Sequence, residues 1–158
     1  MTYTTGLSLI EIITENEESP KAIIMAGGAG SGKSYLLNQL NLNDLAQFNP
    51  DKYVEDPDHP FHNNLGAASR QVEKDVLSAA ENKIRLIWDT TASGKKFDEH
   101  LDKLLSLGYG IYMVMVYTHP MISYISNFKR KRNIPSSSVF LTWRNAYNKI
   151  EHFRNKLK

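Results

Sequence analysis

The chain alternates short, continuously apolar runs with longer stretches in which apolar residues recur every three or four positions. Residues 21–26 and 111–117 are apolar almost throughout and stop at glycines or at His119-Pro120, which predicts buried strands of a parallel sheet. Shorter apolar runs at residues 46–49 and 84–88 predict two further strands.

Helical spacing fills the stretches between these runs, because apolar residues three and four positions apart share one face of a helix. The predicted helices are residues 33–40, a stretch around 72–80, residues 97–105, a basic helix over residues 121–132, and a last helix that opens after Pro135 and includes Phe153. Alternating strands and helices are typical of the α/β class, whose crossover connections are right-handed. We expect one domain over residues 1–158, with a mostly parallel sheet flanked by helices and residues 1–20 as an N-terminal extension.

Composition narrows the class of protein. The 158 residues are 41% hydrophobic and 23% charged, which is ordinary for a globular domain. The absence of cysteine excludes disulfide scaffolds, thiol catalysis and cysteine-ligated zinc. No apolar run approaches the roughly 18 residues of a membrane span. No basic residue precedes the apolar residues 7–13, as one would in a signal peptide, so we expect a cytoplasmic enzyme or binding domain without membrane contact.

Charge is distributed unevenly along the chain. Residues 1–120 hold 10 basic and 16 acidic side chains, whereas residues 121–158 hold 9 basic and 1 acidic. The formal net charge of +2 therefore hides a basic C-terminal third. Such a third either binds an anionic ligand or forms a solvated basic surface.

A glycine-rich segment follows the first predicted strand and precedes the first predicted helix. Residues 27–34 read GGAGSGKS and match the G-x-x-x-x-G-K-[ST] pattern of the P-loop. Glycines let the backbone turn tightly, so that its N–H groups converge on phosphate oxygens beside the positive end of the helix. Lys33 would neutralise the β- and γ-phosphates, and the Ser34 hydroxyl would bind Mg²⁺. The motif predicts a nucleoside triphosphate site made of Gly27, Gly28, Ala29, Gly30, Ser31, Gly32, Lys33, Ser34 and Tyr35.

Two aspartates follow predicted strands, and such positions lie at the ligand-facing edge of an open parallel sheet. Asp89 would hold Mg²⁺ directly or through water, or else cap a helix or turn. Asp51 would accept the proton of an attacking hydroxyl, or else close a turn after Pro50. The spacing of residues leaves both alternatives open for Asp51.

The surrounding motifs indicate the kind of P-loop protein. Asp89-Thr90-Thr91-Ala92 lacks the glycine of the D-x-x-G motif, which argues against a GTPase. Residues 49–53, the pair Asp89-Thr90 and residues 116–134 instead follow one another in an order that resembles the kinase domain of 5′-polynucleotide kinases. The order is also similar to that of the zeta-toxin kinases, which phosphorylate the sugar of UDP-N-acetylglucosamine. The resemblance extends over residues 21–155.

The resemblance implies roles for individual residues. Asp51 matches the general base that activates the acceptor hydroxyl, and Asp89 and Thr90 match a pair that lines the acceptor site. One departure concerns Val54, because polynucleotide kinases place an arginine three residues after the catalytic aspartate to hold the substrate phosphate.

The resemblance also implies a basic lid over about residues 121–135. Arg130 and Arg132 lie in the segment that matches the arginine-bearing lid of these kinases, which closes over the triphosphate. Four consecutive basic residues on a helix cannot all face one phosphate, since each is rotated by about 100° from the last. We expect these two arginines to act together, because a planar guanidinium can bridge phosphoryl oxygens.

The sequence therefore predicts a P-loop kinase that moves the γ-phosphoryl of Mg·ATP to a hydroxyl. Its predicted catalytic residues are Lys33, Asp51, Arg130 and Arg132, and its predicted metal ligands are Ser34 and Asp89. The basic C-terminal third favours the 5′-hydroxyl of a nucleic acid as acceptor, whereas Val54 favours a nucleotide sugar or another small acceptor. A nucleotide-binding switch without phosphotransfer is a third alternative. ATP rather than GTP, and a protein partner such as an antitoxin or a repair enzyme, are implied by the resemblance alone.

Overall fold

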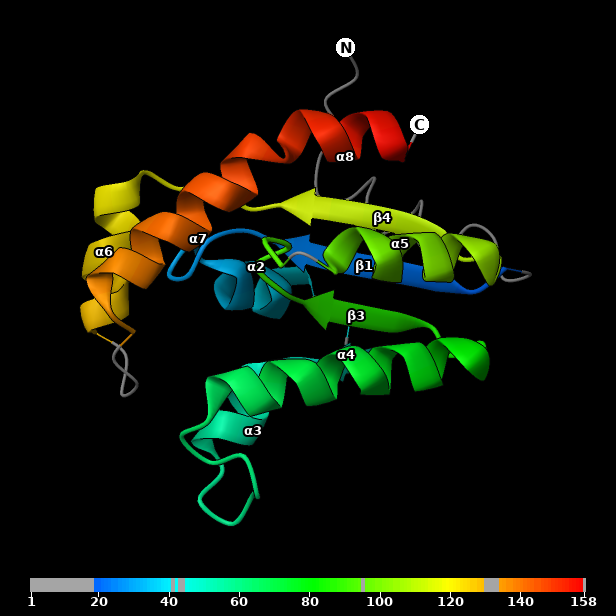
Figure 1. Cartoon of the computed structure of the whole chain (residues 1–158), viewed down its shortest axis with the longest axis horizontal. Coiled ribbons are helices and arrows are strands. Elements are labelled where there is room, and N and C mark those ends of the chain that lie inside the picture. Colours follow the sequence, from blue (N-terminus) through cyan, green and yellow to red (C-terminus); the bar gives the residue numbers. More distant parts are fainter. Residues whose placement is uncertain (1–18, 41, 43–44, 95, 130–133, 158) are drawn as a thin grey trace.

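The computed structural model describes residues 19–40, 42, 45–94, 96–129 and 134–157. Four strands form one sheet in the order β2–β3–β1–β4, and all three pairings are parallel (Figure 1). The strands are β1 (Lys21–Ala26), β2 (Ala46–Phe48), β3 (Leu86–Asp89) and β4 (Gly110–Met115). The helices are α2 (Lys33–Leu40), α3 (Pro50–Glu55), α4 (Leu65–Glu81), α5 (Phe97–Ser106), α6 (Pro120–Phe128), α7 (Ser136–Asn148) and α8 (Ile150–Lys156). Within the described ranges, no helix has both the length and the apolar character needed to cross a membrane.

β1 is an inner strand of the sheet, and all six of its residues are buried. From β1 the chain passes through α2 to β2 and β3 on one side, whereas β4 pairs with the other side of β1. The strand order therefore reverses at β1, and open parallel sheets bind their ligands at such a reversal, beyond the carboxyl ends of the strands. The P-loop begins at this point. The α/β class and the parallel sheet that the sequence predicts are confirmed.

Two apolar cores cover the two faces of the sheet, because successive side chains of a strand point to opposite faces. On one face, Ile24 and Trp88 pack with apolar side chains of α4, α5 and α8. On the other face, Ile23 and Ile87 pack with those of α2 and the segment after it. The sheet is thus held between helices on both sides, and its carboxyl edge is left for the site.

Three helices differ from the sequence prediction. α3 is unpredicted, and it begins where Asn49 caps the first turn and Pro50 takes the first helical position. The predicted last helix is divided into α7 and α8, because the N–H of Lys149 bonds to the carbonyl of Ala146 in a tighter turn. α6 begins at Pro120 and ends at Phe128, whereas the basic helix is predicted over residues 121–132, of which 130–132 lie outside the described residues.

α6 and α7 pack directly on the backbone of the P-loop. A Cβ added at Gly30 would lie 2.3 Å from the carbonyl oxygen of Ser123 in α6, and one added at Gly28 would lie 2.8 Å from Cα of Trp143 in α7. Gly30 also has a φ of +77°, in the left-handed region that favours glycine. At these two positions the packing of the helices requires a residue without a side chain.

α8 is held to α5 by charges around Asp98. Nε2 of His152 lies 2.6 Å from the carboxylate of Asp98, and Nζ of Lys149 and of Lys156 lie 3.6 and 3.7 Å from it. Burial acts to raise the pKa of Asp98, but the hydrogen bond and charge of His152 and the charges of both lysines outweigh it and hold the pKa below its ordinary value. A carboxyl group whose pKa is lowered by folding stabilises the folded state at pH values above its unfolded pKa.

We expect Gly30→Ala to lower the free energy of unfolding by about 2–4 kcal/mol, because it combines left-handed backbone strain with overpacking against Ser123. Gly66 is the matched control, since an added Cβ there meets nothing closer than 3.7 Å, within α4. Gly66→Ala should leave stability unchanged or raise it by up to about 1 kcal/mol. Urea denaturation followed by circular dichroism measures both variants. Equal stability of the two variants would contradict the close packing of α6 on the P-loop.

We expect Asp98→Asn to lower the free energy of unfolding at pH 5 by about 1 kcal/mol or less, because solvent screens ion pairs at a partly exposed site. The contribution of Asp98 is complete above its unfolded pKa and is lost as the pH falls through its lowered folded pKa. The difference in Tm between parent and variant should therefore narrow between pH 5 and pH 3. Glu99→Gln, on an exposed residue of the same helix, is the control. A difference that widens towards pH 3 would be inconsistent with the lowered pKa.

Candidate functional site

The carboxyl edge of the sheet opens into a cavity of about 540 Å³, here called the main cavity. The P-loop, the segment after β2, the segment after β3, α4 and the start of α7 all contribute to its wall. Six residues singled out from the sequence line it together: Ala29, Lys33, Ser34, Asp51, Asp89 and Thr90. Residues that lie far apart in the chain therefore meet around one space.

The Lys33 side chain folds back over the P-loop. Its Nζ donates hydrogen bonds to the carbonyl oxygens of Gly27 and Gly28, at 3.0 and 3.3 Å, and lies 3.8 Å from Oδ1 of Asp89. The ammonium group is thus held at the floor of the main cavity.

The P-loop also packs closely against the end of β4. Gly27, at the turn from β1 into the loop, has a φ of +149°. An added Cβ there would lie 2.5 Å from the carbonyl oxygen of Val116.

One amide of the P-loop already has a partner on α7. The N–H of Ala29 donates to Oγ1 of Thr142 at 3.3 Å, and both residues line the main cavity. The hydroxyl thus takes the hydrogen bond that a phosphate oxygen would accept. An inward-facing amide beside an ammonium group, at the start of a helix, is a set of donors that fits a polyphosphate.

The same cavity offers oxygen ligands for a cation. Ser34, in the first turn of α2, and Asp89, at the end of β3, both line it. A hydroxyl and a carboxylate beside a phosphate site are the ligands that Mg²⁺ takes in nucleotide-binding proteins. Within the described parts of the chain, no three His, Asp or Glu side chains converge as a metal site. An ion held at Ser34 and Asp89 would therefore complete its shell with phosphate oxygens and water.

Asn49 links the two aspartates that line the cavity. Its Oδ1 accepts a hydrogen bond from the N–H of Asp51 at 2.8 Å, and its Nδ2 donates to Oδ2 of Asp89 at 3.2 Å. Asp51 lies in the first turn of α3, where the positive end of the helix favours a carboxylate. One amide side chain thus fixes the start of α3 and orients the carboxylate at the end of β3.

The wall opposite the P-loop carries further polar side chains. Ser69 and Glu73 line the cavity from α4, and Thr91 and Ser93 line it from the segment after β3. The hydroxyl groups of Thr91 and Ser93 are 2.8 Å apart, and Oγ1 of Thr90 accepts a hydrogen bond from the N–H of Ala92. A ligand in this part of the cavity meets hydroxyl and carboxylate groups.

Several polar residues of the cavity wall are not predicted from the sequence, among them Asn49, Glu73 and Thr142. A signal exists for Asn49, because an Asn before Pro-Asp is a common start of a helix. Glu73 follows the buried Val72 in a long amphipathic helix, so its position resembles that of any exposed polar residue. Thr142 depends on the packing of α7 against the P-loop, which no local pattern reveals.

Some predicted residues do not reach the cavity. Tyr35 is 72% exposed and is absent from the cavity wall. Ser31 is buried, and its hydroxyl would lie 2.8 Å from a Cβ at Gly27, beneath the P-loop. Arg130 and Arg132 lie outside the described residues, so their lid role stays a prediction.

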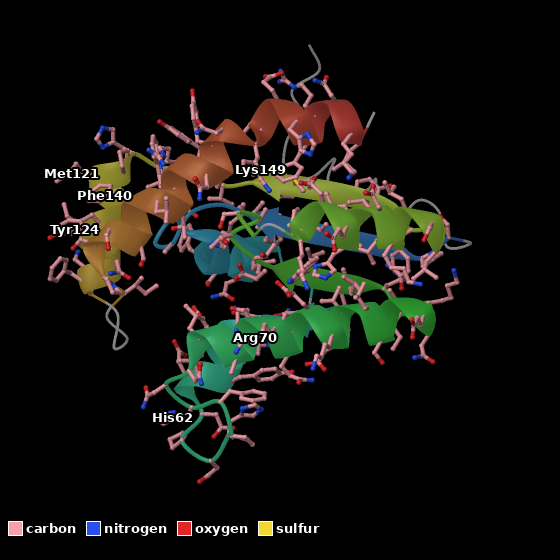
Figure 2. All side chains as sticks on the ribbon, in the orientation of Figure 1. His62, Arg70, Met121, Tyr124, Phe140 and Lys149 are labelled. Atoms are coloured by element: carbon pink, nitrogen blue, oxygen red, sulfur yellow. The ribbon has the colours of Figure 1, made fainter. Side chains whose placement is uncertain are left out.

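Aromatic residues beside the site are structural in this arrangement. Trp143 is half-buried, and its Nε1 donates to the carbonyl oxygen of Thr118 at 2.7 Å. Figure 2 shows Tyr124 and Phe140 where α6 meets α7, and their rings stack with centroids 5.7 Å apart. The contacts of Trp143, Tyr124 and Phe140 join α6 to α7 and fix them over the P-loop. His62 lies away from them, in the loop between α3 and α4 (Figure 2).

Several solved structures share this fold. A chain of the Pnkp1/Rnl/Hen1 RNA repair complex matches with a TM-score of 0.63 and 18% identity, covering 89% of this chain and 48% of that one. A chain of the PezAT chromosomal toxin–antitoxin system of Streptococcus pneumoniae matches with a TM-score of 0.56 and 18% identity, covering 80% and 62%. A chain of the complex of AvrRxo1-ORF1 with AvrRxo1-ORF2 matches with a TM-score of 0.66 and 13% identity, covering 96% and 54%. The chain thus spans between about half and three fifths of the length of these relatives.

Comparison of the sequence with families gives a more specific result. No curated protein matches the chain. The family described as zeta toxin matches over residues 8–155, which include the whole P-loop and every described element except the last residue of α8. Since this match extends over nearly all of the sequence, and the fold is that of the P-loop kinases, the chain belongs to the zeta toxin family.

Proposed function

We propose that this chain transfers the γ-phosphoryl group of Mg·ATP to a hydroxyl group of an acceptor bound in the main cavity, with Asp51 as the general base. The observation that carries the proposal is the convergence of Lys33, Asp51 and Asp89 around one cavity, with Asn49 linking the backbone N–H of Asp51 to the carboxylate of Asp89. A cation for phosphate, a carboxylate for metal and a second carboxylate for the acceptor proton are the groups that this reaction needs.

Each group of the site has a separate role in the proposed reaction. P-loop amides and Lys33 would hold the β- and γ-phosphates, with Lys33 leaving the carbonyl oxygens of Gly27 and Gly28 for phosphoryl oxygens. Ser34 and Asp89 would hold Mg²⁺, which neutralises charge that develops on the phosphates. The acceptor oxygen forms a bond to the γ-phosphorus while the bond from that phosphorus to the bridging oxygen breaks. ADP leaves, and the acceptor proton passes to Asp51.

The cavity wall favours a small, hydroxyl-rich acceptor over a nucleic acid. Among the described residues of the wall, Lys33 is the one lysine or arginine, and it belongs to the phosphate side. The acceptor side has the carboxylates of Asp51 and Glu73 and several hydroxyl groups, which can form hydrogen bonds with the hydroxyl groups of a sugar. Val54, the position at which polynucleotide kinases carry an arginine, is 2% exposed and therefore packs inside the fold. A nucleotide sugar is the acceptor that we propose.

A nucleic-acid 5′-hydroxyl is the second candidate, favoured by the basic C-terminal third. Part of that charge is already paired within the structure. Lys149 and Lys156 pair with Asp98, and Arg154 pairs with Glu151 at 3.0 Å. The charge available to a polyanion is therefore smaller than the sequence alone indicates. An antitoxin or a repair enzyme remains the proposed class of protein partner.

The proposal is tested by supplying ATP labelled in its γ-phosphate together with nucleotide sugars and a 5′-hydroxyl oligonucleotide. We expect label in the nucleotide-sugar pool, and a loss of about 10²–10⁴-fold in rate for Asp51→Asn, because general-base catalysis contributes this much. Asp58→Asn, on an exposed residue of the loop after α3, is the matched control. Calorimetry with ATP checks that Asp51→Asn still binds the nucleotide.

Other results distinguish the alternatives. Label on the oligonucleotide, with a rate that falls steeply as salt increases, would support the nucleic-acid acceptor, since salt competes with phosphate contacts. ATP binding without transfer to either acceptor would favour a nucleotide-binding switch and contradict the proposed kinase. An unchanged rate in Asp51→Asn would remove Asp51 as the base.

Asn49 allows its two hydrogen bonds to be tested separately. Asn49→Ala removes both, whereas Asn49→Ser keeps a cap for the N–H of Asp51 and removes only the donor to Asp89. We expect Asn49→Ala to be less stable than Asn49→Ser by about 1 kcal/mol, the usual contribution of such a cap. Both variants should lose about 10-fold in kcat, the effect of about 1.4 kcal/mol in the transition state, because the Asp89 carboxylate is no longer oriented. Full activity of Asn49→Ser would argue against an orienting role.

A further inference from the structure

A second hollow, of about 430 Å³, lies between β4 and α8 and is here called the edge groove. Among the described residues, its wall includes Ile111, Met113 and Met115 from β4, and Ile150, Phe153, Arg154 and Leu157 from α8 and its end. β4 is an edge strand of the described sheet, and its residues are half-buried, whereas those of β1 are buried. An apolar edge strand with a hollow beside it is a surface that proteins usually cover.

The chain contains an apolar segment of matching chemistry close to this groove. Residues 7–13 read LSLIEII, and they lie outside the described residues. The chain enters the described fold beside the start of the groove, because the carbonyl oxygen of Pro20 accepts a hydrogen bond from the N–H of Gly110, the first residue of β4. The attachment point of the N-terminal segment is thus fixed at one end of the edge strand.

The length of the connection fits the groove. Six residues, 14–19, separate the apolar segment from Pro20, and an extended chain of six residues spans up to about 20 Å. The six residues of β4 span about 20 Å as well, since a parallel strand rises about 3.3 Å per residue. Residues 7–13 can therefore reach any part of the groove without displacing β1.

The charge of the N-terminal residues and the range of the family match both support residues 7–13 as the segment that fills the edge groove. Residues 1–18 carry four acidic side chains and no lysine or arginine, whereas the one charged side chain among the described residues of the groove wall is that of Arg154, which also pairs with Glu151. The zeta toxin family match begins at residue 8, so most of the apolar segment lies within the region that the family shares. We propose that residues 7–13 bind in the edge groove of their own chain, with their apolar side chains against Met113 and its neighbours. This inference does not depend on the proposed kinase activity.

Disulfide trapping in the full-length chain tests the proposal, since the sequence has no cysteine that would interfere. Met113→Cys is combined in turn with Leu9→Cys, Ile10→Cys and Ile12→Cys, and the pairs are oxidised and separated under non-reducing conditions. At least one pair should form an intramolecular disulfide, which requires Cα atoms within about 7 Å. Tyr112→Cys is the matched control, because Tyr112 belongs to the core on the opposite face of the sheet and should form no such bond.

Thiol labelling gives a second readout that does not depend on disulfide geometry. Replacing Leu9, Ile10 and Ile12 together by serine should raise the labelling rate of Met113→Cys about 10-fold or more, because an uncovered thiol reacts without local opening. Thr14→Ser with Asn16→Ser, outside the apolar segment, should leave the rate unchanged. Disulfide-linked dimers alone would show that a second copy fills the groove and would overturn the proposal. The absence of a disulfide in all three pairs, together with an unchanged labelling rate, would overturn it as well.

Discussion

The architecture depends on the burial of β1 between two parallel neighbours. β3 and β4 pair with opposite sides of this strand, so the segments that follow β3 and β4 diverge at the carboxyl end of β1. The P-loop is the segment that turns there from β1 into α2. Part of the site is then positioned by where the strands stop. Asp89 ends β3, and Asn49 follows β2. A shift of one residue in the register of any strand would move these groups out of the cavity and would turn core side chains to the wrong face.

The charged groups of the site have partners at this same edge of the sheet. Lys33 lies against carbonyl oxygens and close to Asp89, so its charge is solvated by the protein. Asp89 in turn receives a hydrogen bond from Asn49, whose oxygen holds the start of α3. A cation, a carboxylate and an amide thus form a connected polar network at the mouth of an apolar sheet. Such networks fix geometry when their groups are partnered, and this geometry is what a phosphoryl-transfer site requires.

The features that could be predicted depend on residues that are neighbours in the sequence, whereas those that could not be predicted depend on packing between distant segments. β1 and α2 are predicted to the residue, because a continuous apolar run, a glycine-rich turn and a helical repeat are all local signals. The P-loop lysine and both cavity aspartates follow from such signals as well. Thr142 and Glu73 could not be predicted, because they reach the cavity through the packing of whole helices. The split between α7 and α8 was missed for a related reason, since the apolar stripe continues across Lys149 although the backbone does not.

The hydrogen bond between Ala29 and Thr142 has a consequence for affinity. A loop amide that is already satisfied avoids the cost of a buried, unpartnered N–H group. A phosphate bound as proposed would have to replace the hydroxyl of Thr142 at that amide, and the exchange would yield only the difference between two hydrogen bonds. Thr142 would thus compete with the phosphate for the loop amide. In the proposed kinase, the packing of α7 on the P-loop would therefore lower the affinity for nucleotide.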